Sequence, residues 1–95
     1  MKPYKLKAEN TSVGKPVYFN QDEGKAFTLQ SIYYSSNEPA HHLEIYDKDG
    51  DPVSFPMPGQ VDPKVTSVPE TTVVLPISIV DEAGGNTVIL RGYLS

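Results

Sequence analysis

Ninety-five residues fit one small domain, and only 38% of them are hydrophobic, which leaves a thin core. The chain has no cysteine, so no disulfide can staple that core, and no Cys/His spacing suggests a structural zinc. A net charge of −4 argues against a general nucleic-acid binder, and no apolar run is long enough to span a membrane. Oligomerisation or docking onto a larger surface is therefore the expected source of extra stability.

The N-terminal residues 1–15 differ in charge from the rest of the chain. They hold four lysines and one acid for a sum of +3, so residues 16–95 sum to −7. They also lack the apolar segment of a secretory signal. We therefore predict a basic N-terminal arm, residues 1–15, on a β-sandwich domain, residues 16–95. Tyr4 and Leu6 alternate with lysines, as in a short edge strand. A solvated tail is the alternative for the arm.

Alternating apolar residues predict further strands at 16–20, 25–35 and 42–48. Within 25–35, Phe27 and Leu29 fall on one face. The apolar side then switches near Ser31, which indicates a bulge. The dipeptide Asp49-Gly50 follows 42–48 and precedes another alternating segment, a pattern typical of a hairpin.

The C-terminal half is divided by prolines. Residues 56–70 contain four of them, which predicts a stiff surface crossover with at most one short strand at 65–68. Residues 71–95 hold two alternating apolar runs around a loop with two glycines, and we predict a hairpin there. About seven short strands without helical periodicity predict an all-β fold, a small antiparallel β-sandwich or jelly-roll-like barrel.

No pattern predicts catalysis or a bound cofactor. Asp47, Asp49 and Asp51 could supply oxygen ligands for calcium, but the glycine of an EF-hand loop is misplaced and its final acid is absent, which favours a solvated turn. His41 and His42 are adjacent and would point to opposite faces of a strand. No nucleophile motif surrounds any serine. We therefore expect a protein that is not an enzyme and binds neither metal nor cofactor.

Aromatic side chains could form a platform for a sugar or a protein partner, because tyrosine combines a large apolar face with a polar tip. The candidates are Tyr33, Tyr34, Tyr46, Phe19 and Phe27. Tyr33, Tyr34 and His41 flank an apparent loop, which makes these three candidate interface residues. The alternative is that the aromatic residues form the core.

Three segments, FTLQSIYYSS, HHLEIYDKDGDPVSFP and VVLPISIVDEAGGNTVILRGYLS, together resemble a group of small phage virion proteins. Those proteins run as a strand, an x-I-Y-D-x-D-G hairpin, a proline-rich link, a Leu-Pro-x-x-I strand and a final strand. The similarity covers roughly residues 26–95 and does not cover the N-terminal arm. It implies a small β-sandwich attached to the head or tail of a tailed phage.

The resemblance implies a non-enzymatic virion protein, with capsid decoration (cement) on the outer surface of the phage head as the leading function. A tail-fibre or carbohydrate-binding module is the alternative. The expected partner is the major capsid protein, without nucleic acid or membrane, and quasi-threefold points on capsids favour a homotrimer. In this interpretation Tyr4 and Leu6 anchor the arm on the partner. The predicted interface residues are Tyr4, Leu6, Lys2, Lys5, Lys7, Tyr33, Tyr34 and His41.

Overall fold

The computed structural model describes residues 1–36, 41–57 and 64–95, and this part of the chain contains eight β-strands. In chain order they are β1 (Lys2–Ala8), β2 (Val17–Phe19), β3 (Ala26–Tyr34), β4 (His41–Tyr46), β5 (Pro52–Met57), β6 (Val65–Val74), β7 (Ile77–Asp81) and β8 (Val88–Leu94). No helix long and apolar enough to cross a membrane occurs in the described residues.

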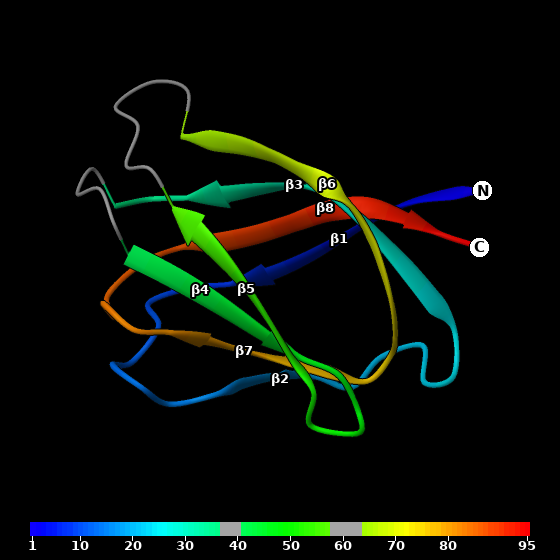
Figure 1. The fold of residues 1–95 in the computed structure, drawn as a ribbon, viewed down its shortest axis with the longest axis horizontal. Coiled ribbons are helices and arrows are strands. Elements are labelled where there is room, and N and C mark those ends of the chain that lie inside the picture. The colour runs from blue at the N-terminus through cyan, green and yellow to red at the C-terminus, as the bar shows by residue number, and fades with distance from the viewer. Residues whose placement is uncertain (37–40, 58–63) are drawn as a thin grey trace.

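The strands form two antiparallel sheets packed face to face (Figure 1). The first sheet has the order β1-β8-β3-β6, and the second has the order β2-β7-β4-β5. Among the paired strands that the structure describes, β4 and β5 alone are consecutive in sequence, so the chain crosses repeatedly between the sheets. The predicted all-β sandwich with jelly-roll character is confirmed.

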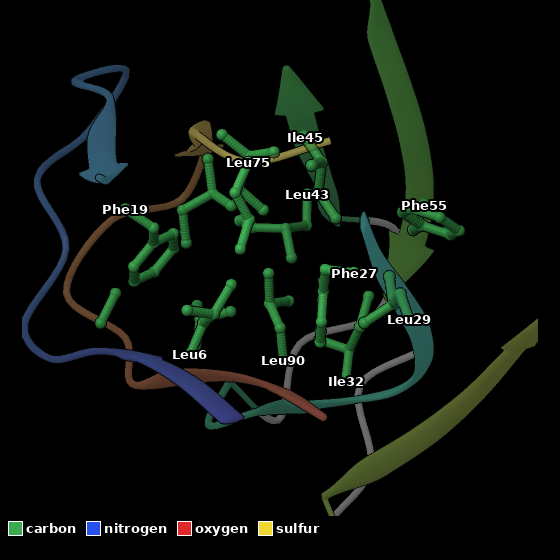
Figure 2. Close-up of a cluster of buried hydrophobic side chains, with 14 of the residues drawn as sticks. Leu6, Phe19, Phe27, Leu29, Ile32, Leu43, Ile45, Phe55, Leu75 and Leu90 are labelled. Carbon is green, nitrogen blue, oxygen red and sulfur yellow. The ribbon is translucent and has the colours of Figure 1, made fainter. Parts of the chain in front are cut away.

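The core lies between the sheets and follows the two-residue alternation of the strands. Leu6, Ile32 and Leu90 point inward from the first sheet, and Leu43 and Ile45 point inward from the second (Figure 2). Each of these side chains is at most 3% exposed. Full burial of a large aliphatic side chain stabilises a fold by about 1.5–3 kcal/mol. This packing therefore holds together two sheets that no disulfide links.

A β-bulge in β3 places apolar residues from both halves of the strand on one face. The register of β3 with β6 and with β8 shifts between Leu29 and Ser31. In the pairing with β8 the extra residue is Gln30, which is exposed, so Phe27 before the bulge and Ile32 after it both point into the core. The bulge predicted near Ser31 is confirmed.

The C-terminal residues do not form the predicted hairpin. β7 pairs with β2 and β4 in the second sheet, whereas β8 pairs with β1 and β3 in the first. The run 71–80 is also divided, because Pro76 has no N–H to continue the ladder and stands between β6 and β7. Two consecutive strands with one apolar face can pair in the same sheet, or they can lie in different sheets and face each other across the core. Alternation of apolar residues is the same in both arrangements, so it does not predict which one forms.

Residues 2–8 are a strand of the sandwich in the structure. β1 pairs with β8 along its whole length, from Lys2 opposite Leu94 to Ala8 opposite Val88, and forms an edge of the first sheet. The edge strand predicted here is therefore present. It is part of the folded body, because Leu6 and Ala8 are buried in the core.

The proline-rich connection is shorter than predicted. β5 extends to Met57, and the strand predicted at 65–68 continues as β6 to Val74. The rest of the predicted crossover, residues 58–63, lies outside the described residues.

Candidate interaction surface

Basic side chains gather on the outer face of the first sheet. The register places Lys5 of β1 opposite Arg91 of β8, and Arg91 opposite Ser31 of β3. In the next row, Lys7 lies opposite Ile89, which lies opposite Tyr33. These residues point outward because their neighbours along each strand point into the core. We call this surface the basic face (Lys5, Lys7, Ser31, Tyr33, Ile89 and Arg91).

The positive charges of the basic face are poorly neutralised. Lys5 and Arg91 stand directly opposite each other on adjacent strands, where like charges repel. Lys7 pairs with Glu9 at 3.0 Å, but neither Lys5 nor Arg91 has an ion-pair partner among the described residues. A shallow groove beside them is lined by Pro3, Tyr4, Lys5, Arg91 and Gly92. An anionic group from a partner molecule would relieve this repulsion.

The outer face of the second sheet carries tyrosines and an acid. Tyr18 of β2 lies opposite Ser78 of β7, which lies opposite Tyr46 of β4. The Tyr46 hydroxyl donates a hydrogen bond to Glu44 on the same face, and this bond is the main cause that raises the pKa of Tyr46. Tyr18 is 65% exposed, unusually open for an aromatic residue. We call this surface the tyrosine face (Tyr18, Glu44, Tyr46, Ser78 and Val80).

Two acidic turns lie at one end of the second sheet (Figure 1). The ends of β2 and β4 pair with the start of β7, so the β2–β3 turn and the β4–β5 turn leave the sheet on the same side. We call these turns the acidic end (Asp22, Glu23, Asp47, Asp49 and Asp51).

The string from Asp47 to Asp51 forms the turn of the β4–β5 hairpin predicted from Asp49-Gly50. Oδ1 of Asp47 accepts hydrogen bonds from the backbone N–H groups of Asp49, at 2.8 Å, and Asp51, at 3.1 Å. An aspartate that accepts from its own turn is a common turn device. Within the described ranges, no three His, Asp or Glu side chains come together in a group that could hold a metal ion.

A buried carboxylate ties the loops at the other end of the sandwich. Asp81, at the end of β7, is 1% exposed. Its carboxylate accepts hydrogen bonds from the hydroxyls of Thr11 and Tyr34, each at 2.6 Å, and from Nδ2 of Asn86 at 3.0 Å. The Ala83 N–H donates to it at 3.1 Å. We call this set the Asp81 network (Thr11, Tyr34, Asp81, Ala83 and Asn86).

The protonation states in the Asp81 network follow from these donors. Burial pushes the pKa of Asp81 upward, but the hydrogen bonds from Thr11, Tyr34, Asn86 and the Ala83 amide together outweigh it and hold the pKa below its usual value. Burial first, and then the bond to Asp81, raise the pKa of Tyr34, which therefore stays a donor. The Asp81 carboxylate is therefore ionised, and four donors of the protein occupy its two oxygens.

The predicted anchors of the N-terminal arm lie inside the sandwich or at its edge. Leu6 is 1% exposed and cannot contact a partner while β1 is folded. Tyr4 is half-buried, with its ring centroid 5.8 Å from that of Phe27 and its hydroxyl donating to Asp22 at 2.5 Å. Burial and that hydrogen bond raise the pKa of Tyr4 to about 12. Lys2, Lys5 and Lys7 are exposed.

The other predicted interface residues are not brought together. Tyr33 lies on the basic face, whereas Tyr34, its neighbour, is buried in the Asp81 network. His41 lies in β4 opposite Met57, and its side chain is outside the described part of the structure. Of the aromatic platform, Phe19 and Phe27 are core residues and Tyr46 lies on the opposite sheet from Tyr33.

Sequence reasoning missed Arg91, Ile89 and Tyr18 as surface candidates. Ile89 and Arg91 occupy alternate positions of β8, so the alternation did place them on one face. It could not show that Lys5 lies opposite Arg91, because the two residues are far apart in the sequence and come together only through the pairing of β1 with β8. Pairing, and not composition, creates the basic face.

Comparison with known proteins finds a solved structure with a similar fold. No protein-family model and no curated protein matches the chain. The crystal structure of the Drosophila NLP core, a nucleoplasmin core, is similar with a TM-score of 0.61 at 13% sequence identity, covering 100% of this chain and 99% of that one. That study concerned pentamer formation and histone binding by the NLP core. At this identity the likeness establishes the shared β-sandwich fold.

This likeness corrects the predicted function. The whole chain is similar to the NLP core, whose structure was studied for pentamer formation and histone binding. The predicted phage cement function is wrong on this finding, as are the tail-fibre or carbohydrate-binding alternative and the homotrimer on a major capsid protein. The predicted location on a phage head depended on that function and stays an untested prediction.

Proposed function

We propose that this protein is a non-enzymatic assembly subunit that forms a closed ring and binds basic polypeptides through acidic surface groups. The observation that carries the proposal is the likeness to the NLP core over essentially the full length of both chains. Because the match covers the whole of this chain, the entire sandwich corresponds to the part of that protein associated with pentamers and histones.

The charge of the chain supports a basic partner. The net charge is −4 with a pI near 4.9, and the acidic end gathers five carboxylates in two adjacent turns. Summed surface charge steers oppositely charged partners and raises their association rate. Binding built on such contacts weakens as salt is added, because ions screen exposed charges.

The chemistry of the buried groups supports a role without catalysis. Asp81 is the most buried carboxylate among the described residues, and four donors from the protein already occupy it. A general acid or base has to reach a substrate proton within hydrogen-bond distance. Asp81 cannot do so without breaking the loops that it connects.

The test of this function is the binding of a basic polypeptide. We expect the purified protein to bind a fluorescent core-histone dimer in a titration at low salt, with affinity that falls as salt rises. Lysine substitution of Glu23 and Asp49 in the acidic end should weaken this affinity at least tenfold, since two carboxylates are lost and two like charges appear.

The control is the variant with Glu70→Lys and Glu82→Lys. Both residues are exposed and lie outside the acidic end, and the net charge changes by the same amount. This variant should bind histone more tightly than the first. Absence of histone binding by the wild-type protein at low salt would contradict the proposed function, and equal losses in the two variants would contradict the role of the acidic end.

A further inference from the structure

The four edge strands of the sandwich are poorly suited to pairing with another copy. β1 carries three lysines and Pro3, and β2 is three residues long. β5 contains Pro52 and Pro56, and β6 contains Pro69 near its middle. Lysine, proline and short length are the devices by which proteins block edge-to-edge association. Assembly of this chain is therefore expected to use the faces of the sheets.

A closed ring places a geometric demand on those faces. In a cyclic assembly with an odd number of subunits, each subunit meets its two neighbours through two different patches, because a self-complementary contact ends in a dimer. The outer faces of the two sheets point in opposite directions (Figure 1). One subunit can therefore offer a different face to each neighbour, and the inclination between the two contacts closes the ring.

We propose that the basic face of one subunit packs against the tyrosine face of the next, with a second copy of this chain as the occupant of both. The inference rests on the proposed ring-forming function and adds its interface. On one side stand Lys5 and Arg91, opposed and without ion-pair partners among the described residues. On the other stands Glu44, with Asp47 and Asp51 close by at the acidic end.

The side chains of the two faces are complementary in character as well as in charge. Tyr18 and Tyr46 offer aromatic rings to the Arg91 guanidinium, which stacks on such rings. Ile89 and Tyr33 add half-exposed apolar surface to the basic face, and Val80 adds it to the tyrosine face. Contact between the faces removes the repulsion between Lys5 and Arg91 and buries Tyr18.

Cysteine cross-linking tests this contact in a chain that has no cysteine of its own. Ser31→Cys marks the basic face next to Arg91, and Ser78→Cys marks the centre of the tyrosine face. With a short bis-maleimide, a mixture of the two single variants should give cross-linked dimers, and neither variant alone should. A chain carrying both substitutions should give a ladder that ends at the closed ring. Ser12→Cys, in the exposed connection after β1, reports random collision.

The outcomes separate the interface from the ring itself. Dimers from Ser31→Cys alone or Ser78→Cys alone would indicate a self-complementary contact and overturn the proposal. A cross-linking yield no greater than that of Ser12→Cys would also overturn it. If native mass shows that the wild-type chain is a ring in either case, the proposed function survives. A wild-type protein that stays monomeric at high concentration overturns both.

Charge reversal gives a second measurement on the same contact. Arg91→Glu alone and Glu44→Arg alone should each shift the native mass toward the monomer. The chain that carries both substitutions exchanges the two charges across the interface, so it should recover the assembled mass. Circular dichroism shows whether each variant keeps its β-sheet. Failure of the double variant to recover, with the fold intact, would contradict the pairing of these two faces.

Discussion

At the scale of single residues, Asp81 shows how a buried charge is accommodated in a small sandwich. Its network joins Thr11, which follows β1, to Asn86, which precedes β8, and to Tyr34 at the end of β3. Backbone bonds reinforce the link, since the Thr11 N–H donates to the Asn86 carbonyl at 3.1 Å. The carboxylate therefore fixes the loops by which the chain crosses between the two sheets.

Removing one donor of this network should destabilise the protein. Tyr34→Phe leaves a buried carboxylate with one hydrogen bond fewer, and we expect a loss of about 1.5–3 kcal/mol in the free energy of unfolding. Tyr93→Phe is the matched control, because the hydrogen bond from the Tyr93 hydroxyl to Glu70 is long, at 3.4 Å, and lies at an exposed site. Its cost should stay within about 0.5 kcal/mol. Urea titrations of the two variants make the comparison, and equal costs would contradict the importance of the network.

The same network predicts how stability depends on pH. The pKa of Asp81 is lower in the folded state than in the unfolded chain, where an aspartate has a pKa of about 3.9. Its contribution is therefore complete above that unfolded value and is lost as the pH falls through the folded pKa. Melting temperatures between about pH 2 and pH 7 should fall on the acid side, with a shallower slope in Tyr34→Phe. An unchanged slope in that variant would show that other carboxylates dominate the acid side.

At the scale of elements, the close approach of β3 and β8 next to the bulge depends on Gly92. Gly92 of β8 lies beside β3, where a Cβ would stand 1.7 Å from the carbonyl oxygen of Thr28. A Cβ does not fit at that distance, so one of the strands would have to move. The central pairing of the first sheet thus requires a glycine for the close approach of two backbones.

Gly92→Ala should therefore disrupt the first sheet. We expect a loss of at least about 3 kcal/mol, since overpacking against backbone cannot be relieved by a side-chain rotation. Gly85→Ala is the control, because Gly85 has a positive φ of 72° but nothing within 4 Å of its Cβ position. It should cost only about 1 kcal/mol. Equal melting temperatures for the two variants would contradict the steric role of Gly92.

How much of this could be read from the sequence also differs between elements. The strands at β2, β3 and β4 and the bulge followed from alternation, because burial of one face imposes that pattern locally. The pairing of β7 and β8 with strands of different sheets did not follow, since partners are chosen by long-range packing. The Asp81 network has the same origin: Thr11 and Asp81 are 70 positions apart, and no local signal connects them.

At the scale of the whole molecule, β1 links the assembly surface to the stability of the fold. It presents Lys5 and Lys7 on the basic face and buries Leu6 and Ala8 in the core. The sequence placed these residues in an arm because their charge differs from that of the rest of the chain. The charges of an edge strand lie on its outward side, so charge composition does not show that the alternating residues on its inward side are buried in the core.

Deletion of residues 1–8 should consequently unfold the sandwich instead of trimming it. The deletion removes β1, exposes the side of Leu90 that Leu6 covers, and opens the edge of β8. Loss of one buried leucine alone costs about 2–5 kcal/mol, a large share of the stability of a small domain. A truncated protein with the wild-type melting temperature and circular dichroism spectrum would contradict the placement of β1 in the core.

The central claim is that the chain assembles as a ring that accepts a basic polypeptide. Native mass spectrometry of the wild-type protein, with and without a core-histone dimer, tests both parts at once. We expect a closed assembly whose mass is a multiple of the 10.4 kDa chain mass greater than two, with an added mass when histone is present. A species of 10.4 kDa at every concentration, unchanged by histone, would contradict it.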